Sequence, residues 1–185
     1  MNSPKQASNS GSTTQKFKFC PHCGSDRFSN PYENRLLCSQ CGFTYYVNPP
    51  VSVVAVLKNP QNEILLTKRK YDPGKGLFDL PGGFVEEGET LEQALIREIE
   101  EELNLKISNP IYYKSFVTTY PFKGIVYYPV DTVFICEVSN WAPLKFQDDV
   151  ADILFQAPAL IEDKYLAFSS HQLLMQSLRK HLPYN

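Results

Sequence analysis

The sequence predicts an α+β fold, in which a layered domain of strands and helices follows a small four-cysteine module. Four of the five cysteines form two close pairs in the first quarter of the chain. Beyond them, strand-like segments, a helix-like segment, further strand-like segments and a second helix-like segment follow in that order. This order is typical of a sheet with helices packed against it.

The length and composition fit that architecture and limit the classes of function. The 185 residues suffice for one domain of ordinary size and a small module, and 43% apolar with 21% charged residues indicates a globular chain. A net charge of −2 argues against a protein whose main work is non-specific binding to a nucleic-acid backbone. Because it has no apolar run of about 18 residues and no secretory signal, we expect a cytoplasmic protein without a membrane partner.

We expect three regions along the chain. Residues 1–16 are mostly Ser, Asn, Thr, Gln and Gly without periodicity, and we interpret them as a disordered tail. Residues 17–48 hold the cysteine pairs and are expected to form the small module. Residues 49–185 are expected to form the larger domain. We place the boundary at Asn48-Pro49-Pro50 because proline interrupts strand pairing.

The cysteine module has the spacing of a zinc site. Two C-x2-C pairs are separated by fourteen residues, and each is followed by a glycine, Gly24 or Gly42, where a tight turn needs a permissive backbone. Four thiolates satisfy tetrahedral Zn²⁺ and leave no open position for a substrate water, so we expect a structural zinc ion. A redox pair and an accidental cluster are the alternatives. The predicted ligands are Cys20, Cys23, Cys38 and Cys41.

The larger domain begins with two predicted strands. The β-branched run over residues 51–57 is typical of a buried strand, and residues 63–70 return as a second strand after a turn at 59–62. Three consecutive basic residues at 68–70 end this second strand. One of them could contact a phosphate, or the three could protect an exposed edge strand.

A helix is predicted from Thr90 to Leu103, where strong helix formers predominate. Thr90 is a candidate N-cap residue, and Gln93 is its candidate partner in a capping box. Asn104 stands where a left-handed residue would end the helix, and asparagine is the usual second choice after glycine.

After the helix we expect two long alternating strands over roughly 111–120 and 125–138, joined through Lys123-Gly124. A short strand is expected near residues 153–155. An amphipathic helix over residues 169–182 would close the domain.

The predicted helix carries an unusual group of carboxylates. Glu98, Glu101 and Glu102 are spaced i, i+3 and i+4, so their side chains project together, and two of them fall beside the apolar face. Most runs of charge are simply a solvated helix face. Here, however, crowded carboxylates at the edge of a core would repel one another unless a cation neutralised them. Hard divalent cations, Mg²⁺ above all, are the natural partners of such oxygens.

The segment 83–105 resembles the Nudix box, G-x5-E-x7-R-E-U-x-E-E-x-G-U, in which U is a bulky apolar residue. Every specified position matches except one, because Asn104 stands in place of the final glycine. We expect the fold to tolerate this change, since both residues adopt a left-handed backbone. The preceding GLFDLPGG at 76–83 is similar to the family's G-x-W-x-L-P-G-G, with Phe78 in place of Trp. The resemblance covers residues 51–182 and implies a Nudix α/β/α sandwich with a mixed sheet, preceded by a zinc ribbon.

The resemblance also implies an enzyme that cleaves a nucleoside diphosphate linked to another moiety. Several Mg²⁺ ions, or Mn²⁺, would bridge the carboxylates and the pyrophosphate and would activate an attacking water. Glu98 would be a metal ligand or the general base, and Glu89 and Arg97 would support the site. The other implied metal ligands are the carboxylates of Glu101 and Glu102 and the carbonyl of Gly82.

The tandem of a four-cysteine ribbon and a Nudix domain resembles NADH pyrophosphatases and Nudix enzymes that act on FAD or ADP-ribose. The former carry an S-Q-P-W-P-F motif, of which Tyr120-Pro121-Phe122 is only a faint echo. We therefore expect ADP-ribose or FAD rather than NADH as substrate. Aromatic residues over 112–128 could stack on a base or flavin. The resemblance suggests a further acidic group near the metals from Asp148, Asp149 or Asp152.

Two other functions stay open at this point. The chain could be a non-catalytic Nudix domain that binds ADP-ribose-like effectors and regulates a partner, with the ribbon as adaptor. It could also be a pyrophosphatase that removes oxidised nucleoside triphosphates from the nucleotide pool. We expect a small nucleotide as the ligand and no nucleic-acid partner, and a second subunit of a homodimer could complete the pocket.

Overall fold

The structure is a computed structural model that describes residues 17–32 and 34–181. The predicted tail, residues 1–16, lies outside the described residues. The chain divides into two compact units, which we describe separately: residues up to Pro49 together with Pro121–Tyr127, and Pro50–Tyr120 together with Tyr128 onwards. Across the described residues, the helices are too short or too polar to traverse a bilayer.

The cysteine module is a small antiparallel sheet with two tight turns. Its strands are β1 (Phe28–Tyr32), β2 (Arg35–Cys38) and β3 (Thr44–Tyr46), and β2 lies between the other two. The two turns repeat one pattern, because the Gly24 N–H donates to the Cys20 carbonyl and the Gly42 N–H donates to the Cys38 carbonyl, each over 2.9 Å. Both glycines have φ near +75°, the left-handed conformation that such turns require.

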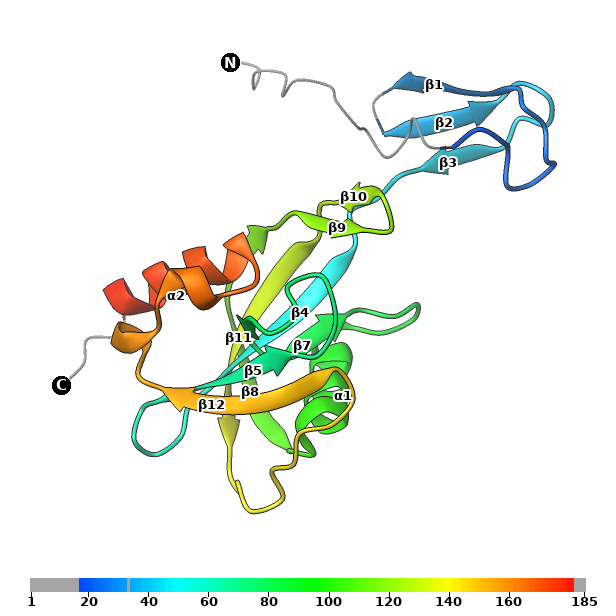
Figure 1. The fold of residues 1–185 in the computed structure, drawn as a ribbon. Coiled ribbons are helices and arrows are strands. Elements are labelled where there is room, and N and C mark those ends of the chain that lie inside the picture. The colour runs from blue at the N-terminus through cyan, green and yellow to red at the C-terminus, as the bar shows by residue number, and fades with distance from the viewer. Residues whose placement is uncertain (1–16, 33, 182–185) are drawn as a thin grey trace. The chain divides into compact units, whose positions relative to one another are not determined.

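The larger unit is built on two sheets (Figure 1). In the first sheet, with the order β7-β4-β11-β8, the central strands β4 and β11 pair parallel and both outer strands pair antiparallel, so the sheet is mixed. In the second sheet, with the order β12-β5-β6, all pairs are antiparallel. The strands are β4 (Val51–Leu57), β5 (Ile64–Arg69), β6 (Phe78–Asp79), β7 (Gly82–Phe84), β8 (Ile107–Val117), β11 (Val130–Val138) and β12 (Val150–Gln156).

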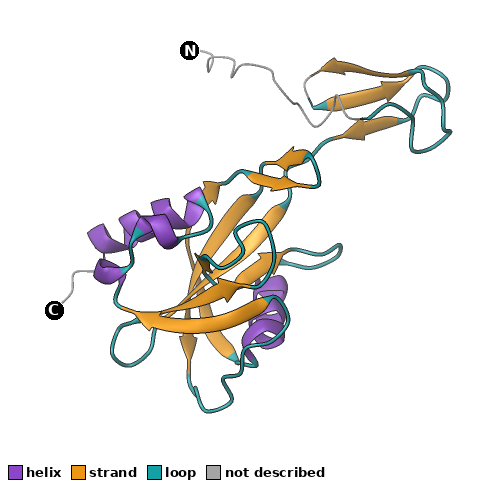
Figure 2. Cartoon of the chain, viewed as in Figure 1, coloured by secondary structure: helices purple, strands orange, loops and turns teal. Residues whose placement is uncertain are grey.

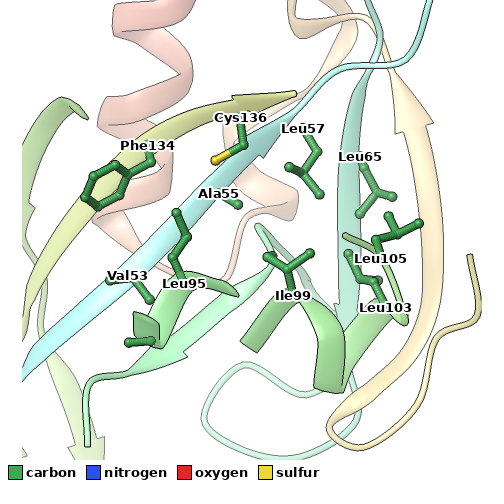
Figure 3. Packing of buried hydrophobic residues seen from close by; sticks show 11 residues of the cluster. Val53, Ala55, Leu57, Leu65, Leu95, Ile99, Leu103, Leu105, Phe134 and Cys136 are labelled. Atoms are coloured by element: carbon green, nitrogen blue, oxygen red, sulfur yellow. The ribbon is translucent and has the colours of Figure 1, made fainter. Parts of the chain in front are cut away.

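The two helices, α1 (Leu91–Leu103) and α2 (Ser169–His181), pack on opposite faces of the mixed sheet (Figure 2). Alternate residues of β4 decide this arrangement. Val53, Ala55 and Leu57 point to the α1 side, where they pack with Leu95 and other helix residues (Figure 3). Val54 and Val56 point to the other side and pack with α2. The predicted sandwich of helix, sheet and helix is confirmed. Two 3₁₀ turns, Pro158–Leu160 and Asp163–Tyr165, precede α2.

Local sequence signals fixed both ends of α1. The Thr90 side chain accepts a hydrogen bond from the Gln93 N–H, and the Gln93 side chain accepts one from the Thr90 N–H, so the predicted capping box is present. Asn104 ends the helix with φ +53°, as predicted for a residue in place of the usual glycine. Its side chain also donates to the Pro143 carbonyl over 2.9 Å, a contact that glycine could not make.

The prediction of two long strands joined through Lys123-Gly124 is wrong. β8 and β11 do pair antiparallel, but β8 ends at Val117 and β11 begins only at Val130. The Lys123-Gly124 turn instead closes a separate short hairpin of β9 (Tyr120–Phe122) and β10 (Ile125–Tyr127). Proline explains the interruption, because Pro121 and Pro129 have no N–H to donate to a continuous ladder.

The alternative that the basic residues at 68–70 protect an exposed edge is also wrong. β5 lies between β12 and β6, and Lys68 faces Asp152 on one side and Phe78 on the other. The strand expected near 153–155 is longer than predicted and forms this pairing over 150–156.

Candidate active site and candidate zinc site

The larger unit contains a cavity of about 390 Å³ between the mixed sheet, α1 and the start of α2. Its wall is made by residues that are distant in sequence, because β4, β7, α1, β11 and α2 all contribute. Five of the six residues expected at a catalytic centre line it. They are Gly82, Arg97, Glu98, Glu101 and Glu102. Glu89, the sixth, contacts this group through Arg97.

Arg97 is the centre of an ion-pair network on α1. Its guanidinium donates to both oxygens of Glu89, over 2.7 and 2.9 Å, and so binds that carboxylate in a bidentate manner. It also contacts Glu98 at 2.9 Å and Glu101 at 3.1 Å, and it donates to the Phe84 carbonyl over 3.0 Å. The hydrogen bonds from Arg97 lower the pKa of Glu89 to about 2. Arg97 therefore holds the loop before the helix against the carboxylates of the helix.

The three helix glutamates differ in exposure as the helical phase predicts. The side chain of Glu98 is only 16% exposed, that of Glu101 is 53% exposed, and Glu102 is half-buried. Glu100, on the opposite side, is exposed. Burial raises the pKa of Glu98 above its ordinary value. Burial also raises the pKa of Glu102 to about 8, and the charges of Asp79, Glu98 and Asp149 add to this rise. The hydrogen bond from the Gly82 N–H acts in the opposite direction and lowers the pKa.

Two glycines allow the backbone to approach these carboxylates closely. The Gly82 N–H donates to Oε2 of Glu102 over 3.0 Å. A side chain at Gly82 would meet the Val53 carbonyl oxygen at 2.1 Å, and Gly82 has φ +139°. A side chain at Gly83 would meet the carboxylate of Glu98 at 2.4 Å. Replacing either glycine would therefore displace a strand or a carboxylate.

The chemistry of these residues suits a divalent cation, although their carboxylates are not drawn together as a closed ligand cluster in this structure. They place oxygen donors on the wall of one cavity, and burial raises the pKa of two of the carboxylates, Glu98 and Glu102. Mg²⁺ and Mn²⁺ prefer such oxygen ligands. Asp148 and Asp149 also line the cavity, whereas Asp152 is not among its lining residues.

The four cysteines of the ribbon come together with the geometry of a tetrahedral metal site. Their sulfurs all lie within 4.8 Å of one another. Among the described residues, these four cysteines are the one group of His, Cys, Asp or Glu side chains that lie close enough together to share a metal ion. Cys20 and Cys41 have sulfurs 3.8 Å apart, and Cys23 and Cys38 have sulfurs 3.7 Å apart. A tetrahedron with Zn–S bonds of about 2.3 Å has sulfur–sulfur distances of about 3.8 Å. The residues therefore fit Zn²⁺.

The cavity contains a second polar network that the sequence reasoning missed. Asp79, at the end of β6, accepts from Arg69 over 2.7 Å through Oδ2, and its Oδ1 lies 2.5 Å from Nδ1 of His171. On the other side of the imidazole, Nε2 lies 3.9 Å from Oδ2 of Asp131, and the Ser52 hydroxyl donates to the same Asp131 carboxylate. No local motif marks these residues, because they come from five separate strands and helices.

The predicted substrate contacts are only partly brought together. Lys68 and Arg69 line the cavity, but Arg69 already pairs with Asp79 and donates to the Pro73 carbonyl over 2.6 Å. Among the aromatic residues at 112–128, Tyr120 alone is a lining residue. Tyr112 instead packs against Phe134, and the Tyr113 hydroxyl contacts Ser177.

Comparison with known proteins identifies the family. Residues 48–174 match the NUDIX domain family. This chain belongs to that family. Residues 6–47 also match the family of ribosomal protein S27a. The resemblance inferred from the Nudix box, and the fold class that it implied, are therefore confirmed.

Two curated relatives are similar over the Nudix region. An NAD-capped RNA hydrolase NudC from Haemophilus influenzae is 39% identical over 117 residues, which cover 62% of this chain and 44% of that protein. An ADP-ribose pyrophosphatase from Methanocaldococcus jannaschii is 40% identical over 117 residues, covering 61% of this chain and 64% of that protein. The chain thus matches less than two thirds of the length of either relative.

Solved structures agree with the family. A NUDIX hydrolase from Nitrosomonas europaea has a TM-score of 0.67 and 26% identity, covering 90% of this chain and 94% of that one. A bifunctional NMN adenylyltransferase/ADP ribose pyrophosphatase from Francisella tularensis, complexed with AMP and a manganese ion, has a TM-score of 0.53 and 27% identity. It covers 72% of this chain and 42% of that one.

Proposed function

We propose that this chain is a metal-dependent pyrophosphohydrolase that splits a nucleoside diphosphate linked to a second moiety and releases a nucleoside monophosphate. The observation that carries the proposal is the meeting of Glu98, Glu101, Glu102 and Gly82 in one cavity, with Arg97 bound to Glu89 beside them. The preferred substrates are ADP-ribose, FAD or a related dinucleotide such as NADH. The names of the relatives, an ADP-ribose pyrophosphatase and an NAD-capped RNA hydrolase, support a dinucleotide-like diphosphate.

In this proposal each residue of the site has a distinct task. Glu98, Glu101 and Glu102, with the Gly82 carbonyl, hold Mg²⁺ or Mn²⁺. The ion pair between Arg97 and Glu89 holds the loop before α1 against the helix. When bound, the metal neutralises the charge of the pyrophosphate and makes water a stronger nucleophile. Glu98 is also a candidate general base, because burial and its acidic neighbours raise its affinity for a proton.

The ribbon has a structural task in this proposal. Residues 17–48 fold around one zinc ion, which the four cysteines enclose, while residues 49–185 carry the chemistry. A closed four-thiolate site has no position for a substrate, so the zinc ion takes no part in hydrolysis.

A panel of substrates with product analysis tests the proposal. Purified protein with Mg²⁺ is offered ADP-ribose, FAD, NADH, NAD-capped RNA, dGTP and oxidised dGTP. We expect the highest kcat/KM for ADP-ribose or FAD, with AMP and a second phosphomonoester as products and no turnover in EDTA. A preference for a nucleoside triphosphate, with free pyrophosphate as product, would assign the chain to nucleotide-pool cleaning. Binding of ADP-ribose without turnover of any substrate would assign it to the non-catalytic class.

A further inference from the structure

The cavity contains buried polar side chains that the proposed metal chemistry does not use. Asp131, on β11, is 6% exposed, and His171, on α2, is 4% exposed, yet both line the cavity. Burying a charged or polar group is costly unless a partner satisfies it. The partners of these two residues therefore indicate what the cavity is built to bind.

His171 is flanked by carboxylates on both sides of its ring. Nδ1 lies 2.5 Å from Oδ1 of Asp79, and Nε2 lies 3.9 Å from Oδ2 of Asp131. Burial alone would lower the pKa of His171, but the charge of Asp79, aided by that of Asp131, raises it above its ordinary value. Both ring nitrogens of the resulting imidazolium are hydrogen-bond donors.

Nδ1 of His171 is in an ion pair with Asp79 without hydrogen-bond geometry, and a second donor and an acceptor are left over beyond it. Ser52 satisfies Oδ1 of Asp131, but neither Oδ2 of Asp131 nor Nε2 of His171 makes a hydrogen bond to a described residue. Their separation of 3.9 Å is too long for a hydrogen bond between them. Instead, a donor and an acceptor lie side by side on the wall of the cavity.

The neighbouring wall is aromatic. The Phe168 ring lies 5.8 Å from the His171 ring and 5.7 Å from that of Tyr120, and Tyr120 lies 5.7 Å from Phe84. All three aromatic residues line the same cavity. The Arg69 guanidinium lies 4.9 Å from the centroid of the Phe168 ring, over its face. Aromatic walls of this kind favour a flat ring over a sugar.

We propose that Asp131 and His171 form a recognition site for the edge of an amino-bearing heteroaromatic ring, such as adenine, within the substrate. The ring amino group donates to Oδ2 of Asp131, and the adjacent ring nitrogen accepts from Nε2 of His171. The site therefore selects a ligand that has a hydrogen-bond donor next to an acceptor on one edge of a flat ring. A ribose has hydroxyl groups for the same atoms but no flat face for Phe168 and Tyr120. The inference deepens the proposed function, because it assigns the moiety that this part of the cavity holds.

Binding measurements on the full-length protein test this assignment. Calorimetry with Mg²⁺ compares AMP, purine riboside 5′-monophosphate, which lacks the amino group, and ribose 5-phosphate, which lacks the base. We expect AMP to bind at least about tenfold more tightly than either of the other two, a difference of about 1.4 kcal/mol. Asp131→Asn should reduce the advantage of AMP over the ligand without the amino group to less than about threefold. His171→Gln should weaken AMP without changing the affinity for ribose 5-phosphate.

Glu137→Gln is the matched control, because Glu137 lies exposed on the same strand as Asp131 and is not a lining residue of the cavity. It should leave all three affinities unchanged. Equal affinity for AMP and ribose 5-phosphate would overturn the assignment, as would an unchanged preference in Asp131→Asn that retains the wild-type melting temperature. If Asp131→Asn fails to fold, His171→Gln decides by the same comparison.

The result is separable from the proposed function. Selective AMP binding that depends on Asp131, in a protein that hydrolyses no diphosphate, would support the recognition site and reject the hydrolase. Hydrolysis of ADP-ribose, with no effect of either substitution on AMP binding, would support the hydrolase and reject the recognition site.

Discussion

The Gly82 N–H donates to Oε2 of Glu102 over 3.0 Å, and this bond joins β7 to the last turn of α1. The contact requires glycine, because a Cβ atom at position 82 would lie 2.1 Å from the Val53 carbonyl oxygen of the neighbouring strand. The adjacent Gly83 has a different neighbour, since its Cβ atom would meet the carboxylate of Glu98. Gly82 is therefore required by the packing of β7 against its neighbouring strand, whereas Gly83 is required by the position of the Glu98 carboxylate.

Alanine at each glycine should give opposite outcomes. Gly82→Ala meets rigid backbone at a left-handed position, so we expect destabilisation on the order of 3 kcal/mol or more, and poor expression. Gly83→Ala meets only the end of a flexible side chain, so we expect a small change in Tm with a large loss of kcat. Thermal denaturation and steady-state kinetics on both variants measure this. Full activity in Gly83→Ala would show that the position of Glu98 is unimportant.

The carboxylates of α1 should differ according to the face on which they lie. We expect Glu101→Gln and Glu102→Gln each to lower kcat by on the order of a hundredfold, because each removes a charge from the proposed metal ligands. Glu100→Gln is the control, since Glu100 is exposed on the opposite side of the same helix turn. Mg²⁺ titrations of the rate would test the cause, as the loss in the first two variants should include weaker metal dependence. An effect of Glu100→Gln as large as that of Glu101→Gln would contradict the assignment of faces.

These features differ in how far the sequence could predict them. The cap at Thr90, the left-handed Asn104 and the phase of Glu98 and Glu102 were predictable, because each depends on residues within one or two turns of a helix. The end of β8 was placed too late and the start of β11 too early, since alternation continued past Val117 while Pro129 interrupted the ladder before Val130.

The network around His171 could not be predicted from one sequence. Its members, Ser52, Arg69, Asp79, Asp131 and His171, stand on five different elements, and only the packing of α2 and the two sheets brings them together. A single histidine at the start of an amphipathic helix is an ordinary surface or core residue by pattern alone. The half of the cavity that we propose to bind metal is thus marked by a local motif, whereas the half that we assign to recognition depends on tertiary structure.

The ribbon should contain about one zinc ion per chain. Although burial opposes it, the N–H groups of Cys41 and Gln40 lower the pKa of the Cys38 thiol to about 7. Although the Phe43 N–H opposes the change, burial and the neighbouring thiols raise the pKa of the Cys41 thiol to about 12. Cys20→Ser and Cys38→Ser should lose the metal and increase hydrogen exchange over residues 17–48, because metal binding and folding are coupled in small modules. Cys136→Ala is the control, since Cys136 is buried in the core beside α1. Wild-type protein purified under reducing conditions without zinc would refute this prediction.

The Asp79–His171 pair should make the stability of the larger unit depend on pH. The charges of Asp79 and Asp131 raise the pKa of His171 above its ordinary value of 6.5 despite burial, so its contribution is complete below pH 6.5 and is lost as pH rises through the folded pKa. The charges of His171 and Arg69 lower the pKa of Asp79 below its ordinary value of 3.8 despite burial, so that contribution is lost only as pH falls below 3.8. The pair therefore stabilises most between pH 3.8 and pH 6.5.

His171→Gln measures this contribution, because it removes the charge and leaves Asp79 paired with Arg69. Breaking one side of a buried pair costs about 3 kcal/mol, so we expect a clear drop in Tm at pH 6. The drop should shrink as pH is raised, since the wild-type imidazole then loses its proton as well. NMR titration of the histidine rings gives an independent value, and the His171 signals are those missing from the variant spectrum. A His171 that titrates at or below pH 6.5 would refute both the sign of this pH dependence and the assignment of Nε2 as a donor.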